Sequence, residues 1–399
     1  MKYYIISGEA SGDLHASNLM KELRKLDANF DFRCWGGDLM QAAGGTLVKH
    51  YRDLAFMGFA EVIQNIGTIF KNISFCKQDI AAYKPDVLIL VDYPGFNLRI
   101  AKWARQQGLK IVYYISPQIW AWKESRIHSI KKNVDKMLVI LPFEKDFYAR
   151  WNFEAEYVGH PLIEVVDAFQ RSQKAGQKSI VESRMSSKST ISPMFDDQSA
   201  SISNDSVGII ALLPGSRQQE ILKKLPIMLQ VATHFPAYQF VVAKAPGLPA
   251  AFYDDLLSPF KNVTSVSNRT YELLSQSEAA LVTSGTATLE TALFAVPEVV
   301  CYMGNKISYH IARRLIKIKY ICLVNLIMDK EVVKELIQDE LTVENLVREL
   351  TLLLSDENKK AELQREYALL RELLSAGGHA SANAAKSIYQ MMGDGLPYY

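Results

Sequence analysis

The sequence predicts an α/β protein with two doubly wound parallel sheets, each in a domain of its own. Two observations lead to this prediction. Short Val/Ile/Leu-rich runs alternate with amphipathic helical patterns from the first residues, and the same alternation restarts after a polar segment in the middle of the chain. Strands this apolar are buried on both faces, which is typical of parallel sheets covered by helices on both sides.

The first domain is expected over residues 1–170. Its predicted strands are the apolar runs YYIIS at 3–7, DVLILVD at 86–92, IVYYIS at 111–116 and MLVILP at 137–142. Between the first two runs, HASNLMKELRKL at 15–26 has the apolar period of an amphipathic helix. This alternation of strand and helix predicts a Rossmann-like domain.

A change of composition marks the middle of the chain. Residues 171–206 are rich in Ser, Lys, Gln and Asp and lack periodic apolar residues, which predicts a flexible linker or insertion. After it, VGIIALLPGSR repeats the layout of YYIISGEASGD: a buried strand, a glycine turn and a helix. A second Rossmann-like domain with C-terminal helices is therefore expected over 207–399. Ligands of such sheets bind at the carboxyl ends of the strands, and two facing domains form a cleft there.

Composition excludes several classes of protein. The 399 residues are 49% hydrophobic and 22% charged with a net charge of +2, which is not the basic excess of a nucleic-acid-binding protein. The four cysteines are scattered without a C-x-x-C pair, so they predict core residues of a reducing compartment rather than a zinc site or disulfides. There is no signal-peptide pattern and no apolar run of about 18 residues, so a cytoplasmic protein without a transmembrane helix is expected.

The turn in LLPGSRQQEI suits an anion. Gly215, Ser216 and Arg217 lie between a predicted strand and a predicted helix. Backbone N–H groups converge at such a helix start, and a neighbouring guanidinium strengthens the attraction for negative charge. We expect a phosphate group here.

A second strand-to-helix turn lies within residues 279–300. Ser284, Gly285 and Thr286 follow the strand, and the next helix carries Glu290 one turn further along. Hydroxyl and N–H groups suit a diphosphate, and a carboxylate suits a ribose diol. The same residues would also form an ordinary helix N-cap with a capping-box glutamate, so the pattern alone leaves both interpretations open.

The turn GEASGD at residues 8–13 matches neither the dinucleotide-binding fingerprint nor the P-loop. Glu9 and Asp13 would repel a phosphate, so together with Ser11 and Gly12 they suit sugar hydroxyls better. A helix cap with an acidic first turn is the alternative.

Asp92 ends an apolar strand in VDYPGFN. A carboxylate that is partly desolvated at a strand end can have its pKa raised into the range of a general base, although such an aspartate can also simply cap the next turn. The chain contains no Asp-x-Asp triplet and no Cys/His cluster. A nucleotide-binding site is therefore expected to work without metal, and no cofactor is expected.

Two segments have the pattern of a membrane-facing surface. Residues 299–328 hold five basic residues and no acidic one: Lys306, Arg313, Arg314, Lys317 and Lys319. Residues 56–73 place apolar side chains on one helical stripe: Phe59, Val62, Ile63, Ile66, Phe70 and Ile73. Each segment suits an anionic membrane or an acylated, phosphorylated substrate, and each also suits a half-buried helix.

Taken together, these stretches resemble the lipid-A-disaccharide synthase family of inverting, metal-independent glycosyltransferases with the GT-B fold. The matching motifs occur in family order: SGEASGD, GG-x-x-MQAAG at 36–44, LAFMGFAEV, KPDVLILVDYPGFN, YYISPQIWAWKESRI, LPFEKDFY, VGHP, LLPGSRQQEI, TSGTATLE and KYICLVNLIMDKEVVKELIQDE. They cover most of the chain except residues 171–206 and the C-terminal end.

The resemblance implies a reaction of lipopolysaccharide synthesis in Gram-negative bacteria. UDP-2,3-diacylglucosamine would be the donor and 2,3-diacylglucosamine 1-phosphate the acceptor, giving a β-1,6-linked disaccharide 1-phosphate and UDP. Asp92 would be the general base. The resemblance assigns UDP-sugar binding to Gly215, Ser216, Arg217, Ser284, Gly285, Thr286, Glu290, Asn325 and Gln338, and acceptor binding to Glu9, Ser11, Gly12 and Asp13. It also implies peripheral attachment to the cytoplasmic face of the inner membrane, whereas a homodimer stays open.

Three positions depart from the family's pattern. Gly95 stands where a second aspartate is usual, Leu39 replaces an arginine, and Val324 replaces the proline before Asn325. Two alternatives also stay open: another UDP-sugar enzyme of this fold, such as a different N-acetylglucosaminyltransferase or an epimerase, and a non-catalytic sugar-nucleotide or lipid-binding protein at the membrane. The GEASGD and PQIWAWK segments favour the family over the first. Asp92, which a pure binder does not need, favours it over the second.

Overall fold

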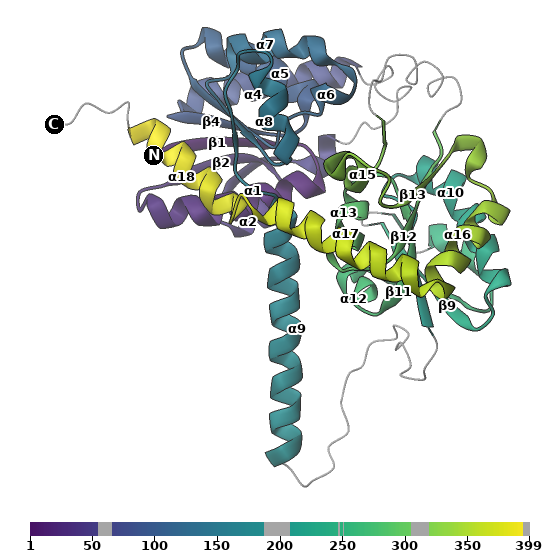
Figure 1. The fold of residues 1–399 in the computed structure, drawn as a ribbon. Helices are drawn as coiled ribbons and strands as arrows, with labels where there is room; N and C mark the ends of the chain where they lie inside the picture. Colours follow the sequence, from purple (N-terminus) through teal and green to yellow (C-terminus); the bar gives the residue numbers. More distant parts are fainter. Residues whose placement is uncertain (55–65, 187–207, 246–247, 250, 305–318, 394–399) are drawn as a thin grey trace. The chain divides into compact units, whose positions relative to one another are not determined.

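The structure, a computed structural model, describes residues 1–54, 66–186, 208–245, 248–249, 251–304 and 319–393. The chain divides into two compact units, one of Met1–Pro161 with Leu373–Tyr399 and the other of Leu162–Glu372. Each unit holds one sheet in which all pairs of neighbouring strands are parallel (Figure 1). The predicted α/β class with two parallel sheets is confirmed.

The sheet of the first unit has the strand order β3-β2-β1-β4-β5-β6-β7. Its strands are β1 (Lys2–Ser7), β2 (Asp31–Gly36), β3 (Thr46–His50), β4 (Val87–Val91), β5 (Lys110–Tyr114), β6 (Lys136–Val139) and β7 (Ala155–Tyr157). The chain builds outward from β1 to β3 and then returns to the other side of β1. The carboxyl ends of β1 and β4 therefore flank the point where the strand order reverses, which is where open sheets of this kind bind ligands.

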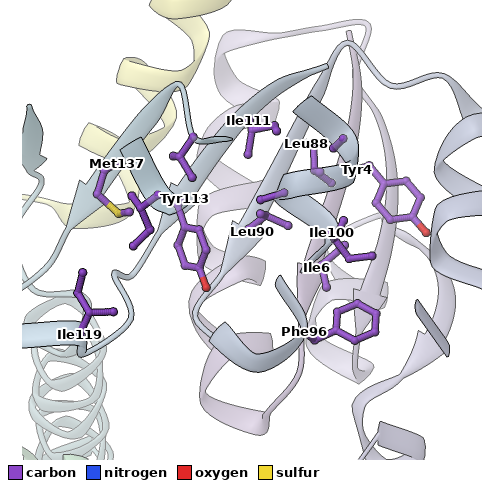
Figure 2. Close-up of a cluster of buried hydrophobic side chains, with 14 of the residues drawn as sticks. Tyr4, Ile6, Leu88, Leu90, Phe96, Ile100, Ile111, Tyr113, Ile119 and Met137 are labelled. Atoms are coloured by element: carbon purple, nitrogen blue, oxygen red, sulfur yellow. The ribbon is translucent and has the colours of Figure 1, made fainter. Parts of the chain in front are cut away.

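Alternating side chains of these strands build two cores. In β1, Tyr4 and Ile6 point to one face, where Figure 2 shows them with Leu88 and Leu90 of β4. Tyr3 belongs to the core on the opposite face. The helices of this unit are α1 (Ala10–Leu26), α2 (Asp38–Ala42), η1 (Tyr51–Leu54), α4 (Ile66–Tyr83), α5 (Pro94–Gln106), α6 (Ile119–Trp122), η2 (Glu124–Arg126), α7 (Ile127–Asn133), α8 (Pro142–Ala149) and α18 (Ala380–Gly393). Helices α4, α5 and α7 contribute to the first core, and α1, α2 and α18 to the second.

The sheet of the second unit has the order β10-β9-β8-β11-β12-β13, which repeats the first six strands of the other sheet. Its strands are β8 (Gly208–Leu213), β9 (Tyr238–Lys244), β10 (Val263–Ser267), β11 (Ser277–Thr283), β12 (Glu298–Tyr302) and β13 (Lys334–Ile337). Its helices are α10 (Gln218–Val231), η3 (Ala232–His234), α11 (Ala251–Leu257), α12 (Thr270–Leu274), α13 (Thr286–Leu293), α15 (Leu323–Met328), η4 (Gln338–Glu340) and α16 (Val343–Ser355). Here the strand order reverses between β8 and β11, which makes their carboxyl ends the expected ligand edge.

The structure differs from two predicted boundaries. Residues from Leu373 onward belong to the first unit, because α18 packs on α1 and buries small apolar side chains such as Ala384 in the second core of that unit. Residues 171–186, predicted as linker, continue helix α9 (Pro161–Ser186). Their Gln, Lys, Ala, Arg and Glu residues are good helix formers, so propensity extends the helix without an apolar stripe. The rest of the predicted linker, 187–206, lies outside the described residues. Helix α17 (Glu357–Ser375) carries the chain back to the first unit.

All four cysteines are buried and unpaired by disulfides, which confirms the prediction of core cysteines. Within the described ranges, no helix combines the length and the apolar composition needed to cross a membrane.

Candidate active site

Asp92 directly follows β4 at the ligand edge of the first sheet. Its backbone is held firmly: its N–H donates to the carbonyl of Tyr114 at 3.2 Å, and its own carbonyl accepts from the Tyr113 hydroxyl at 2.6 Å and the Asn97 amide at 2.8 Å. These three bonds fix the point from which the carboxylate extends. A group that must meet a substrate with defined geometry needs such support.

The backbone is strained at this edge. Asp92 and Tyr93 have φ angles of 44° and 47°, and Ile115, which follows the neighbouring strand β5, has φ 62°. The left-handed region is costly for residues other than glycine, and most of all for a β-branched isoleucine. Strain of this kind persists where surrounding bonds enforce it, and it clusters at active sites.

Burial raises the pKa of the Asp92 carboxyl from 3.8 to about 7, with a further contribution from the negative charge of Glu9 and an opposing one from the Tyr93 backbone N–H. Glu9 follows β1, the strand that pairs with β4, so parallel pairing brings the two carboxylates to the same edge. A carboxyl group with this pKa can accept a proton near neutral pH. The geometry therefore supports the predicted role of Asp92 as a general base.

The turn at residues 8–13 is built for close packing. A side chain on Gly8 would run into the Tyr93 ring, and one on Gly12 would run into the Ser7 hydroxyl. Ser11 is exposed and Glu9 is partly buried. Both follow β1, and their assignment to acceptor binding stays a prediction.

Asp13 stabilises the start of helix α2. Its side chain is buried, and its two carboxylate oxygens accept the backbone N–H groups of Gly37, Leu39 and Met40 at 2.8, 3.1 and 3.1 Å. It thereby caps α2, a short helix that follows the next strand. A direct contact of Asp13 with the acceptor is still a prediction, because three of its acceptor positions are already occupied.

In the second unit, the PGSR turn follows β8. Gly215 has φ 113°, a conformation that favours glycine, and Ser216 and Arg217 are exposed. The Arg217 guanidinium lies 3.4 Å from the Glu220 carboxylate and is 49% exposed, so it is accessible to a ligand. Helix α10 begins directly after it. This is the arrangement that the sequence predicted for a phosphate-binding turn.

The turn after β11 lies on the neighbouring strand. Gly285 has φ 148°, Thr286 is exposed, and the Ser284 hydroxyl donates to the carbonyl of Ile321 at 2.9 Å. The Tyr271 hydroxyl donates to Glu290 at 2.9 Å, and burial raises the pKa of that carboxyl. Sequence analysis did not identify Tyr271, because the hydrogen bond joins residues 19 positions apart.

Asn325 and Gln338 differ sharply in their surroundings. Asn325 is fully buried, and its amide exchanges hydrogen bonds with the backbone of Val332 and Val333 and with the Glu335 carboxylate. The side chain supports the chain before β13, and a contact with UDP stays a prediction. Gln338, directly after β13 and with φ 55°, has a buried amide nitrogen without an acceptor among the described residues. A bound ligand would satisfy that nitrogen.

The two predicted membrane-facing segments are described only in part. Phe59, Val62 and Ile63 lie outside the described residues, as do the basic residues from Lys306 to Lys317. Of the remainder, Phe70 is 60% exposed, whereas Ile73 is buried, and Lys319 pairs with Asp329 at 2.9 Å.

Strand order and edge geometry together define the class of protein. The fold is similar to that of UDP-GlcNAc 2-epimerase from Neisseria meningitidis bound to UDP-GlcNAc, with a TM-score of 0.65 and 15% identity over 99% of this chain and 100% of that one. It is also similar to the calicheamicin glycosyltransferase CalG4, with a TM-score of 0.58 and 15% identity over 99% of both chains. The chain thus has the GT-B fold that glycosyltransferases and such epimerases share.

Sequence comparison then identifies the family. The Lipid-A-disaccharide synthetase family matches residues 3–391. A lipid-A-disaccharide synthase of Geobacter metallireducens is 35% identical over 395 residues, which cover 98% of this chain and 97% of the relative. Lipid-A-disaccharide synthase 1 of Legionella pneumophila strain Paris is 36% identical over 98% of this chain and 97% of its own length. The chain belongs to the lipid-A-disaccharide synthetase family of glycosyltransferases.

Proposed function

We propose that the protein transfers 2,3-diacylglucosamine from its UDP derivative to the 6-hydroxyl of 2,3-diacylglucosamine 1-phosphate. Membership of the family supports this pair of substrates. The observation that carries the chemistry is Asp92, a rigidly held carboxylate at the ligand edge with a pKa raised to about 7.

In the proposed step, Asp92 accepts the proton of the acceptor's 6-hydroxyl as that oxygen attacks the anomeric carbon of the donor. The new carbon–oxygen bond forms as the bond to the diphosphate breaks, and UDP leaves with the electron pair. A single displacement of this kind inverts the anomeric configuration and gives the β-1,6 linkage. Negative charge grows on the departing diphosphate, so donors aimed at it contribute most to the rate.

We assign those donors to the second unit: the PGSR turn with Arg217, the turn at Ser284–Thr286 and the amide of Gln338. Glu290 would bind the ribose diol, while Glu9 and Ser11 would contact the acceptor. Helix N-termini and a guanidinium can neutralise a diphosphate without a metal ion. The proposed reaction is therefore metal-independent.

We also propose that the enzyme works at the cytoplasmic face of the inner membrane, where acylated substrates of this kind reside. Phe70, in the described part of the predicted stripe, supports this because it is 60% exposed. Phe75, further along α4 and outside the predicted stripe, is 46% exposed. Exposed aromatic side chains on a helix can insert into the interface of a bilayer.

The test is mass spectrometry of products formed from the two substrates in detergent and EDTA. We expect the disaccharide 1-phosphate and UDP from the wild type, almost none from Asp92→Asn, and normal amounts from Asp146→Asn, which changes an exposed aspartate of the same unit. The anomeric proton coupling of the product, measured by NMR, reports inversion. If the wild type binds the UDP-sugar and forms no disaccharide, the acceptor assignment or the catalytic role is wrong.

A further inference from the structure

Lys224 is a buried cation close to the PGSR turn. It lies on α10, and its side chain is only 3% exposed. Its ammonium donates a short hydrogen bond to the Thr283 hydroxyl at the carboxyl end of β11, and it lies 3.9 Å from the Glu220 carboxylate. Among the residues that the structure describes, these are its polar partners. A lysine is rarely this buried, because removal of an ammonium from water is costly unless other charges compensate.

The ammonium faces the turn directly. A methyl group built on Gly215 would lie 3.6 Å from Lys224 Nζ, 3.4 Å from Glu220 Oε2 and 3.3 Å from Thr283 Cγ2. The buried Lys224 ammonium therefore lies next to Gly215, whereas Ser216 and Arg217 of the same turn are exposed. No side chain of Gly215 separates the ammonium from a ligand bound at the turn.

The charges around the turn do not balance. Glu220 is shared between two cations, with Oε1 3.4 Å from Arg217 Nη1 and Oε2 3.9 Å from Lys224 Nζ. One carboxylate near two cations leaves one excess positive charge among these three groups. Of the two cations, Lys224 is buried and Arg217 is exposed. Burial lowers the pKa of the Lys224 ammonium, while the nearby Glu220 carboxylate opposes that effect. A bound anion would remove the imbalance.

We infer that Lys224 is a positioning residue of the donor site: a buried positive charge that stabilises the donor's diphosphate through the PGSR turn, with Glu220 as its counter-ion when the site is empty. This inference rests on the proposed function, because it takes UDP as the group bound at the turn. The ligand it recognises is the diphosphate and not the uridine.

The test compares binding of UDP and uridine by isothermal titration calorimetry. Lys224→Met keeps an unbranched apolar side chain and removes the charge, and Lys223→Met is the matched control because Lys223 is exposed on the same helix. At an effective dielectric constant of about 20, two unit charges about 7 Å apart interact strongly enough to change an affinity by ten- to a hundredfold. We expect that loss for UDP with Lys224→Met, with uridine affinity unchanged and with both affinities unchanged for Lys223→Met.

For a second variant we expect a change in UDP affinity in the opposite direction. Glu220→Gln removes the competing carboxylate, so UDP affinity is expected to rise several-fold while uridine affinity stays constant. This variant changes a partly exposed side chain, so the inference can still be refuted even if Lys224→Met does not fold, as judged by its thermal denaturation.

The possible results distinguish failure of this inference from failure of the proposed function. Equal UDP affinity of wild type and Lys224→Met, parallel losses for UDP and uridine, or unchanged or weaker UDP binding by Glu220→Gln would overturn the inference and leave the proposed function intact. Failure of the wild type to bind UDP at all would instead remove the donor site itself, and with it the proposed function.

Discussion

The pH dependence of catalysis is the sharpest test of the proposed base. With a pKa of about 7, about half of the Asp92 side chains are ionised at pH 7 and about one in a hundred at pH 5. The value of kcat/KM, which reports the free enzyme, should therefore fall about fiftyfold between these two pH values. An aspartate with the ordinary pKa of 3.8 would lose less than about a tenth of its ionised fraction over the same interval.

The perturbation that isolates Asp92 is Glu9→Gln. The acceptor's phosphate also titrates, with a second pKa of about 6. The wild-type profile alone therefore does not show which group causes the fall in kcat/KM at low pH, the acidic limb of the profile. Removal of the Glu9 charge lowers the pKa of Asp92 and leaves that of the phosphate unchanged. Burial is the larger cause of the raised pKa of Asp92 and is unaffected by Glu9→Gln. The midpoint of the acidic limb should therefore move only part of the way from about 7 toward 3.8.

The assay measures kcat/KM for the acceptor from pH 5 to 8.5 with wild type, Glu9→Gln and the control Glu154→Gln, which changes an exposed carboxylate of the same unit. We expect the acidic limb of Glu9→Gln to lie at lower pH than that of the other two proteins, whatever its absolute rate. A flat wild-type profile, or limbs that coincide in all three proteins, would refute the reasoning.

Four further changes give separate predictions. Asp92→Asn should stabilise the protein at pH 8 by up to about 4 kcal/mol, since the raised pKa means that ionisation of Asp92 disfavours the folded state as pH rises from 3.8 through about 7; at pH 3 the gain in urea denaturation should vanish. Arg217→Ala should reduce turnover at least tenfold and change the free energy of unfolding by less than about 1 kcal/mol, because its pair with Glu220 is exposed. Asp13→Ala should lower the free energy of unfolding by about 2–3 kcal/mol, because three backbone N–H groups lose their acceptor. Tyr271→Phe should weaken binding of UDP several-fold and of 2′-deoxy-UDP much less, if its bond orients Glu290 toward the ribose; equal losses in calorimetry would contradict that role.

Sequence analysis could place the edges of both sheets for a simple reason. Apolar runs predict strands, and in a parallel sheet the residues that follow adjacent strands meet at one edge. Asp92 and Glu9 follow strands that pair, as do Arg217 and Ser284. No long-range information was needed for these four residues. The prediction required only that the strands follow the order that is usual for a doubly wound sheet.

Long-range polar bonds could not be predicted in the same way. Asp13 caps a helix that begins 25 residues later, and the docking of α18 on the first unit depends on a surface more than 350 residues away. The apolar period of a helix shows that it has a face to bury and does not say against which sheet. Lys224 carried no signal either, because a lysine on a surface helix is ordinary until the fold buries it.

The buried polar groups among the predicted site residues differ in whether their hydrogen bonds are made. What an unsatisfied group indicates depends on where it lies in the sheet. Asn325 and Asp13 are buried with their hydrogen bonds made, as expected of supporting groups. Gln338 keeps an amide nitrogen without an acceptor in the described part of the chain, and it lies at the ligand edge of its sheet. Both carboxylate oxygens of Glu298 also lack partners there, yet Glu298 begins β12 and so lies at the opposite, amino end of the strands. An unsatisfied buried group therefore points to a ligand when it lies where parallel strands end together. Gln338 meets that condition, which agrees with its predicted role in UDP binding.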